Sequence, residues 1–171
     1  MNTIMKTHLG MSFDFTNFNK YQINIYDIAH ALSHICRFNG HCDRFYSVAE
    51  HSVRASYIES DHEVDARAHI LLHDATEAYL GDVVTPLKCL FPEYIKLENK
   101  LAKIIFDKYC LESYNSSIEN SIHFADKSIL QTEFKELFNN DDSQFGWSPE
   151  QAKFEFIWRY NDLVHQKLIR K

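Results

Sequence analysis

The sequence contains few of the residues that interrupt a regular backbone. Among its 171 residues are 4 glycines and 3 prolines, and no proline precedes Pro86. Glycine and proline mark the turns of proteins built from many short strands, so their scarcity favours long helices over a β-sandwich. Apolar residues make up 45% of the chain and charged residues 25%, which is ordinary globular composition and excludes disorder over most of the length.

Long apolar runs and an excess of basic charge are also missing. No apolar run reaches about 18 residues, and residues 1–20 carry polar groups every few positions, so we expect neither a membrane span nor a signal peptide. The formal net charge of −6 disfavours non-specific nucleic-acid binding. The 4 cysteines form no CxxC pair, which is typical of free thiols in a reducing compartment. The sequence therefore predicts a cytoplasmic protein that binds no nucleic acid and no membrane.

Apolar residues recur every three or four positions in several segments, which is the period of an amphipathic helix. Asn24 can cap a helix from Ile25 to about Phe38, and the capping-box pattern Ser47–Glu50 opens a helix to about Glu59. The other expected helices begin at Ser60 or Asp61, at Pro92, at about Ile118 and at Ser148. The first of them runs to Leu80 with or without a kink, and the last two run to about Phe138 and about Leu168. We expect an all-α fold of about six helices, forming a single domain over residues 1–171, because no strand-period run is long enough to compete.

Histidine is unusually frequent, with 10 residues. It is the side chain that exchanges protons near neutral pH and the commonest metal ligand. His30 and His34 are four residues apart, as are His69 and His73, a spacing that places two imidazoles on one helix face. Such pairs arise easily by chance in a histidine-rich chain, so neither pair alone predicts a metal site.

A stronger pattern is His73-Asp74 followed by Glu77. The first two residues follow the apolar run Ile70–Leu72, so we expect them inside the fold, where an ionisable pair needs a partner such as a cation. Glu77 comes four residues after His73 and three after Asp74, which on a helix places all three side chains on the same face. A cluster of salt bridges at a helix end explains these three residues equally well.

Two further side chains elsewhere in the chain could join such a centre. His51 shares a helix side with Ala55 and Ile58. Asp126 lies in the largely apolar segment 122–130, where an unpaired carboxylate would be costly. Two imidazoles and two carboxylates suit Mn, Fe, Co or Zn better than Ca, with Mg also possible.

The order His51 … His73-Asp74 … Asp126 is the H…HD…D signature of the HD-domain metal-dependent phosphohydrolases, which the chain resembles over about residues 22–130. Beyond these positions, the resemblance is carried by Cys36–His41, by Tyr46–Ser52 and by the run HDATEAYLGDVVTPLK from His73 to Lys88. The last run is similar to a segment of bacterial 5′-deoxynucleotidases and of phage dATP triphosphohydrolases. The resemblance implies a helical HD-domain bundle with a ligand-bearing core and a C-terminal helix over about 148–168.

The resemblance also implies roles for individual residues. His51, His73, Asp74 and Asp126 would bind one divalent cation (Co, Mn, Zn or Mg), and a second ion could accompany the substrate phosphates. Glu77 would be the catalytic residue that orients the attacking water or shuttles a proton, with a plain surface charge as the alternative.

The candidate substrate-binding residues are Arg37, Phe38, His41, Asp82 and Lys88, and the resemblance implies such a role for Arg37 and Asp82. Arg37 and Lys88 would bind phosphate oxygens, although either could be an ordinary surface residue. Asp82 would contact substrate or hold the arginine, and His41 would bind phosphates or serve only to end a helix. Phe38 stands where the bacterial deoxynucleotidases carry Trp, which puts mononucleotide specificity in doubt because Phe has no N–H donor.

The function expected first is hydrolysis of dATP, or of another dNTP, to a deoxynucleoside and triphosphate. The alternatives are a 5′-deoxynucleotidase acting on dNMPs, a phosphodiesterase for cyclic or alarmone nucleotides, and a nucleotide-sensing module without catalysis. Relatives in the resembled family assemble as dimers or hexamers, which implies a homo-oligomer here as well.

Overall fold

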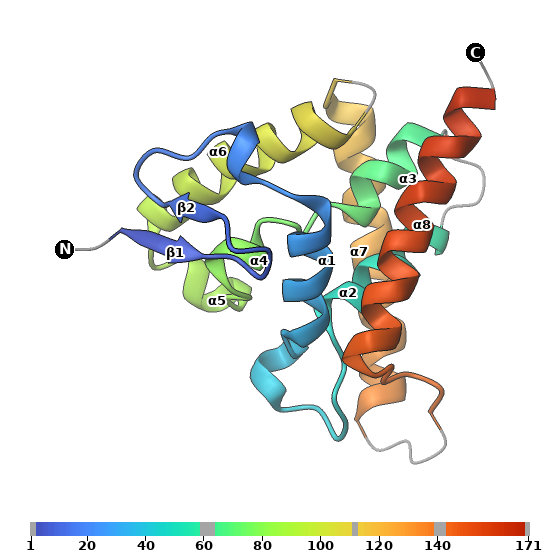
Figure 1. The fold of residues 1–171 in the computed structure, drawn as a ribbon. Helices are drawn as coiled ribbons and strands as arrows, with labels where there is room; N and C mark the ends of the chain where they lie inside the picture. Colours follow the sequence, from blue (N-terminus) through green and yellow to red (C-terminus); the bar gives the residue numbers. More distant parts are fainter. Residues whose placement is uncertain (1–2, 59–63, 111–112, 139–142, 170–171) are drawn as a thin grey trace.

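The computed structural model describes residues 3–58, 64–110, 113–138 and 143–169 (Figure 1). The prediction of an all-α fold is confirmed: these residues form eight α-helices, of which six have eight or more residues. The helices are α1 (Ile25–His34), α2 (Val48–Ile58), α3 (Val64–Leu71), α4 (Glu77–Leu80), α5 (Thr85–Lys88), α6 (Pro92–Tyr109), α7 (Ser116–Leu137) and α8 (Pro149–Ile169). Two 3₁₀ helices, η1 (Lys20–Gln22) and η2 (Arg37–Gly40), and a hairpin of β1 (Ile4–Lys6) and β2 (Ser12–Asp14) complete the described elements.

The helices are arranged around α2 and α3 (Figure 1). Helices α7 and α8 both pack on this central pair, and α1 packs on α2 and α8. On the other side of α1 lie the hairpin, α4, α5 and α6. The core between the helices is apolar and includes the fully buried Ile28, Leu32, Leu71 and Phe156. Burial of these side chains supplies most of the driving force for packing the bundle.

Several helix starts agree with the sequence prediction. The side chain of Asn24 accepts a hydrogen bond from the backbone N–H of Tyr26 and caps α1. Pro92 and Pro149 are the first residues of α6 and α8, where a missing N–H costs nothing. Asn115 caps α7, which therefore begins two residues before the expected start near Ile118.

The end of α1 differs from the prediction. The helix ends at His34 instead of near Phe38, because the following residues are extended and pair with the chain just before α2. The pairing consists of an antiparallel bridge between Cys36 and Ser47 and a 2.9 Å bond from the Arg37 N–H to the Tyr46 carbonyl. Arg37 thus lies at the start of a tight 3₁₀ turn and not at a helix end.

The turn that follows Arg37 contains two residues in the left-handed region, Phe38 (φ 56°) and Asn39 (φ 51°). This conformation is uncommon for residues other than glycine and is most unfavourable for bulky side chains. The Phe38 ring contacts the rings of Phe134 and Phe138 on the α7 side, with centroids 5.6 and 5.4 Å away. Contacts with α7 therefore help to hold the strained turn next to Arg37.

The helix expected to run to Leu80, with or without a kink, is interrupted between α3 and α4. Residues 72–76 form successive tight turns, with the Ala75 N–H bonded to the Leu72 carbonyl and the Glu77 N–H bonded to the Asp74 carbonyl, each at 3.0 Å. Nδ1 of His73 lies 2.7 Å from the Ile70 carbonyl, so this side chain competes for an acceptor that a regular helix would use. The Ser60 and Asp61 caps expected for this helix lie outside the described residues.

The N-terminal hairpin was not expected from the sequence, because strands of three residues are too short to show a period. Phe13 of β2 is fully buried and stacks on Tyr79 of α4, with centroids 4.4 Å apart. In the connecting turn, the His8 ring stacks on His30 of α1 at 3.5 Å. Phe13 therefore brings the N-terminal segment into the common core.

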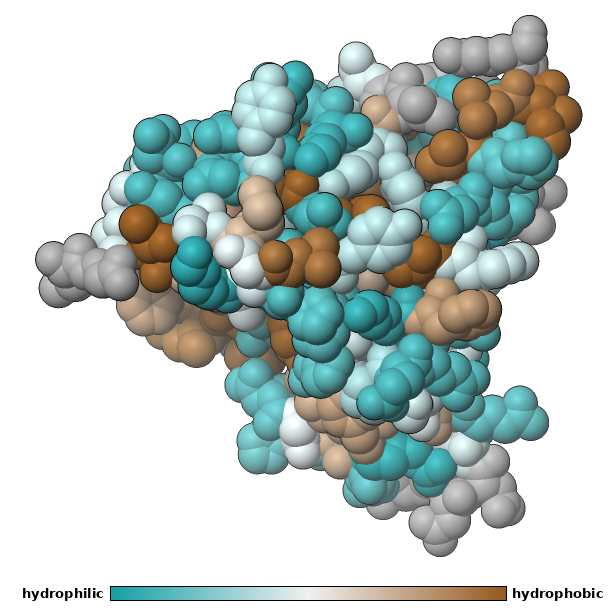
Figure 2. Space-filling view, in the orientation of Figure 1, coloured by the Kyte–Doolittle hydropathy of each residue, from teal (hydrophilic) through white to brown (hydrophobic). Residues whose placement is uncertain are grey.

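The face of the molecule in Figure 2 is mostly hydrophilic, with apolar surface at the C-terminal end of α8 and over the hairpin and α5. Exposed apolar side chains in these regions include Ile4, Leu87, Leu168 and Ile169. None of the described helices has both the length and the apolar character needed to cross a membrane.

Candidate metal centre and adjoining cleft

His51 enters the core from the first turns of α2. Ser47 accepts a 3.1 Å hydrogen bond from the Glu50 N–H, which is one half of the predicted capping box. The other half does not form, because the Glu50 carboxylate accepts bonds from the N–H groups of Gly146 and Trp147 and from Arg54. Helix α2 is thus tied to the segment just before α8, and the His51 side chain is fully buried.

His51, His73 and Asp74 form a group that could hold a metal ion. One ligand atom from each lies within 4.8 Å of the others. Nε2 of His51 is 3.3 Å from Nε2 of His73 and 3.5 Å from Oδ2 of Asp74, and the last two atoms are 3.2 Å apart. Atoms bound about 2.1 Å from one ion lie about 3.0–3.4 Å apart, so the spacing matches a common ligand sphere.

The hydrogen bonds made by Nδ1 of His51 and of His73 leave the Nε2 atoms of the two rings facing each other. Nδ1 of His51 lies 2.6 Å from a carboxylate oxygen of Glu133, and Nδ1 of His73 lies 2.7 Å from the Ile70 carbonyl. These oxygens can only accept, so both Nδ1 atoms donate and both neutral rings present the Nε2 lone pair. Two lone pairs beside a carboxylate repel one another unless a cation lies between them. The donor set therefore fits a divalent ion.

Asp126 of α7 lies at the edge of this group. Its Oδ1 is 3.3 Å from Nε2 of His51 and 3.9 Å from Nε2 of His73. The apolar neighbourhood in the sequence predicted burial, but the side chain is 43% exposed, because Ala125 and Ile129 face the core and Asp126 lies beside them. Asp126 is therefore close enough to complete the ligand set from the open side.

Glu133 is the residue of this site that the sequence analysis missed. It is fully buried, and its two carboxylate oxygens contact Nδ1 of His51 (2.6 Å) and Nη2 of Arg37 (3.2 Å). Glu133 falls on the buried stripe of α7 between Ile129 and Leu137. A carboxylate on an apolar stripe, two turns after Asp126, was the signal available in the sequence.

The charges around the site favour a cation. Burial and the nearby Arg37 lower the pKa of His51, but the carboxylates of Asp126 and Glu133 outweigh both and raise it above its ordinary value. Burial raises the pKa of Asp74, yet the two histidines and Arg37 hold it below the usual range. Partial burial raises the pKa of Asp126, but contact with His51 likewise keeps it well below the usual range. The surroundings of Nε2 thus favour a positive charge.

A cleft of about 230 Å³ opens beside the group. Its lining brings together Arg37, Phe38, Asp74, Glu77, Asp82, Lys88 and Asp126, together with the segment 83–86. Seven residues that the sequence analysis selected from distant positions thus share one cavity. His41 does not line this cleft in the described part of the chain; it is exposed at the end of η2.

Glu77 reaches the cleft although the helix argument used for it was wrong. The chain turns at 72–76, and Glu77 is the first residue of α4. It is 5% exposed, and burial, followed by repulsion from Asp74 and Asp82, raises the pKa of Glu77 to about 10. One oxygen lies 3.6 Å from Nζ of Lys88, and the other has no hydrogen-bond partner among the described residues.

The cations of the cleft are paired with carboxylates. Lys88 donates a 2.7 Å bond to Glu98 of α6. Arg37 is held by Glu133 and, at 3.5 Å, by Asp74, while its Nε has no hydrogen-bond partner among the described residues. Burial lowers the pKa of Arg37, but Glu133 and Asp74 more than compensate, so it stays charged.

The other spaced histidines lie away from this group. Nδ1 of His69 is 2.8 Å from the Asp65 carbonyl, and its ring packs against Phe106. His30 and His34 lie near each other on α1, with ring centroids 4.3 Å apart, next to His8.

The chain is similar over nearly its whole length to an uncharacterized bacterial protein. It is 37% identical over 178 aligned positions to protein YfdR of Escherichia coli strain K12, and the alignment covers 94% of this chain and 96% of that protein. It is 32% identical over 136 positions to an uncharacterized protein of Rhodobacter capsulatus, covering 75% of this chain and 69% of that protein. No family model matches the chain.

Proposed function

The chain belongs to the family of Escherichia coli YfdR, and we propose that it is an HD-domain, divalent-metal-dependent phosphohydrolase that acts on small deoxynucleotides. The observation that supports this proposal is the meeting of two imidazole Nε2 atoms and Asp74 at the edge of a cleft that also contains Arg37 and Glu77. A group of metal-binding side chains alone would suit many functions. A metal group beside a buried guanidinium suits a phosphate ester.

The ion would be held by His51, His73, Asp74 and Asp126, a set of two nitrogens and two oxygens that suits Mn, Co, Zn or Mg. When bound, such an ion lowers the pKa of a water molecule and neutralises charge on a phosphoryl oxygen. Glu133 fixes the ring orientation of His51 through the 2.6 Å contact at Nδ1.

Arg37 would bind the phosphate. Its position is set by Asp74 and Glu133, and its Nε is a buried donor that has no hydrogen-bond partner among the described residues. A buried donor of this kind costs free energy until an acceptor satisfies it, and a phosphate oxygen is a good acceptor. Phe38 and Asp82 line the same cleft and would contact the sugar.

Glu77 would exchange the proton. It lines the cleft with one oxygen near Lys88, and its other oxygen is buried without a hydrogen-bond partner among the described residues, so a bound water or the leaving oxygen of the ester would supply that partner. In this position it would orient the water and pass a proton to the departing alkoxide.

The size and charge of the cleft favour one phosphate over three. The cavity of about 230 Å³ is below the usual range of roughly 300–1,000 Å³ for small-molecule sites, and Lys88 is already paired with Glu98 and Glu77. Arg54, another cation that could serve a triphosphate, bonds Glu50 and stacks on Phe145. We therefore place 5′-deoxynucleotidase action on dNMPs ahead of dATP triphosphohydrolase action.

The test is a metal screen of the full chain with Mn²⁺, Co²⁺, Zn²⁺ and Mg²⁺ against dNMPs, dATP and cyclic nucleotides. Orthophosphate, pyrophosphate and triphosphate are measured separately, and the variant His73→Ala is compared with His165→Ala, which changes an exposed histidine of α8. Metal-dependent orthophosphate release from dNMPs, lost only in His73→Ala, is the expected result. Triphosphate release from dATP would instead identify the triphosphohydrolase. Nucleotide binding without turnover under any metal would contradict hydrolysis and favour a sensing module.

A further inference from the structure

A second cavity, of about 520 Å³, lies between the C-terminal half of α6 and the start of α7. Its lining includes Ala102, Lys103, Phe106, Asp107, Tyr114 and Glu119. It has more than twice the volume of the cleft and shares no lining residue with it. Its volume falls within the usual range for small-molecule sites, about 300–1,000 Å³. We call it the α6–α7 cavity.

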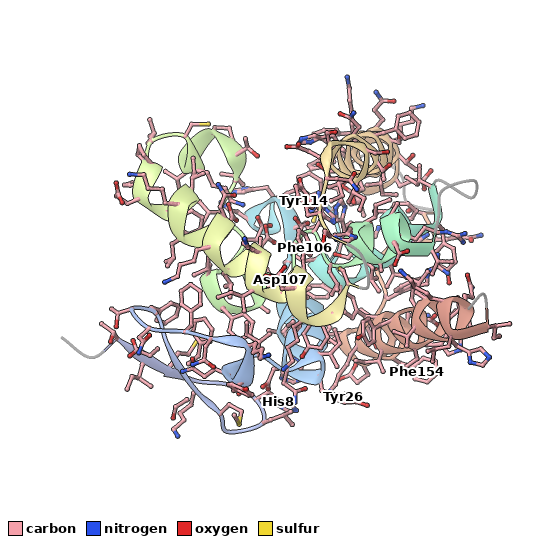
Figure 3. All side chains as sticks on the ribbon, turned by 90° about the horizontal axis from the view of Figure 1, so that it is seen from above. His8, Tyr26, Phe106, Asp107, Tyr114 and Phe154 are labelled. Atoms are coloured by element: carbon pink, nitrogen blue, oxygen red, sulfur yellow. The ribbon has the colours of Figure 1, made fainter. Side chains whose placement is uncertain are left out.

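Three aromatic rings that contact one another lie at the α6–α7 cavity. The buried His69 ring has its centroid 4.9 Å from that of Phe106 and 6.0 Å from that of Tyr114. The Phe106 and Tyr114 rings are nearly parallel, 10° apart, with centroids separated by 5.5 Å. Tyr114 is 47% exposed, and Figure 3 shows it beside Phe106 and Asp107. Because Tyr114 is stacked on Phe106 and about half exposed, a further planar ring can stack on its exposed side.

The charged side chains that line the α6–α7 cavity favour some planar compounds over others according to the charge of the compound. Its lining carries two carboxylates, Asp107 and Glu119, and one ammonium, Lys103, and all three residues are exposed. The net negative charge disfavours a ligand that carries phosphate or carboxylate. Asn99 and Ser113 add neutral hydrogen-bonding groups of the kind that read the edge of a heterocycle.

We propose that the α6–α7 cavity is a second ligand site that takes a neutral or cationic planar heterocycle of the size of a purine nucleoside, stacked on Tyr114. The site does not depend on the metal group or on the proposed hydrolysis. It would bind its ligand equally well in a protein from which all metal had been removed.

The experiment measures binding of adenosine to the chelator-treated full chain by titration calorimetry. Tyr114→Ala removes the stacking ring, and Ala102→Trp fills the cavity from the α6 wall. Tyr26→Ala is the matched control, because Tyr26 is a tyrosine of similar exposure (51%) on α1 and lies away from Tyr114 in Figure 3. Circular dichroism checks that every variant keeps its helices.

We expect adenosine to bind the wild type and Tyr26→Ala equally, and Tyr114→Ala and Ala102→Trp to bind it roughly fivefold or more weakly. Two ring compounds of similar size and opposite charge test whether the cavity prefers cations. Cationic 1-methylnicotinamide should bind more tightly than anionic nicotinate, and Asp107→Asn should reduce the difference. The site is refuted if adenosine fails to bind, or if folded Tyr114→Ala and Ala102→Trp both bind it as the wild type does. Tighter binding of nicotinate would refute the charge argument.

Discussion

The carboxylate of Glu133 joins His51 to Arg37, with one oxygen 2.6 Å from the imidazole Nδ1 and the other 3.2 Å from the guanidinium. A proposed metal ligand and the proposed phosphate-binding side chain thus share a single buried anchor. Burial raises the pKa of Glu133, but His51 and Arg37 hold it below the usual range, so the anchor is ionised.

The variant Glu133→Gln keeps the shape of this anchor but weakens both contacts. We expect metal affinity to fall about 10–100-fold, as is common when the carboxylate behind a ligating histidine is changed. Titration with Mn²⁺ or Co²⁺ measures the change, and Glu136→Gln on the same helix is the control. Unchanged metal affinity in Glu133→Gln would mean that the carboxylate only neutralises Arg37.

Metal binding should stabilise the folded chain. An ion that binds only the native state at 100 times its dissociation constant adds about 2.7 kcal/mol to the free energy of unfolding. Thermal melts with and without Mn²⁺, Co²⁺ or Zn²⁺ should show this stabilisation for the wild type and His165→Ala, and its loss for His73→Ala. Asp126→Asn should reduce it if Asp126 is a ligand. An equal shift in Asp126→Asn and the wild type would remove Asp126 from the ligand set.

Glu77→Gln should separate metal binding from turnover. The amide fills the same space in the cleft but cannot exchange a proton, so we expect the rate to fall about 10²–10⁴-fold with metal content unchanged. Elemental analysis and steady-state rates give the two readouts. Glu98→Gln, which removes the other carboxylate partner of Lys88, is the control. Loss of metal from Glu77→Gln would make Glu77 a ligand instead.

Lys88→Ala should distinguish mono- from triphosphate substrates. A charge-assisted contact to an outer phosphate is worth about 1.5–3 kcal/mol, so a dATP hydrolase should lose roughly tenfold or more in rate. A dNMP has no outer phosphate, and its turnover should change little. Both rates are measured on the same preparation. A tenfold fall for dNMPs would show that Lys88 contacts the single phosphate.

The cysteines should differ in reactivity. Burial raises the pKa of Cys110 far above its ordinary value, whereas Cys89 is exposed after α5. Because the thiolate is the reacting form, iodoacetamide at pH 8 should label Cys89 well before Cys110 in the folded chain. Peptide mass spectrometry follows both sites over time. Equal labelling rates in the native protein would contradict the burial of Cys110.

The parts of the fold that local chemistry determines could be read from the sequence. Asn24, Pro92 and Pro149 mark helix starts because capping and the missing proline N–H act within one turn. The end of α1 could not be read in this way, since it depends on pairing between Cys36 and Ser47, eleven positions apart. Its apolar period continues past His34 and gives no sign of the break.

In the candidate site, too, residues marked by their local sequence could be predicted, whereas those placed by distant contacts could not. His73 and Asp74 were predictable because they directly follow a buried apolar run. Glu133 was harder, since it lies in a helix rich in exposed charges, and its place on the apolar stripe does not by itself predict contacts with His51 and Arg37. The neighbourhood of Glu77 in the cleft was predicted correctly, but through a helix that is in fact broken.

The contact between His51 and Glu133 joins an early and a late part of the chain, which bears on when the proposed metal centre can form during synthesis. The two residues are 82 positions apart, and Asp126 lies on the same late helix as Glu133. While the ribosome has made only α1 to α6, neither Glu133, which contacts the imidazole of His51, nor Asp126, the fourth proposed ligand, has been synthesised. His51, His73 and Asp74 all precede α7 in the chain, so the proposed metal centre would gain its anchor and Asp126 only after the α7 segment has been made.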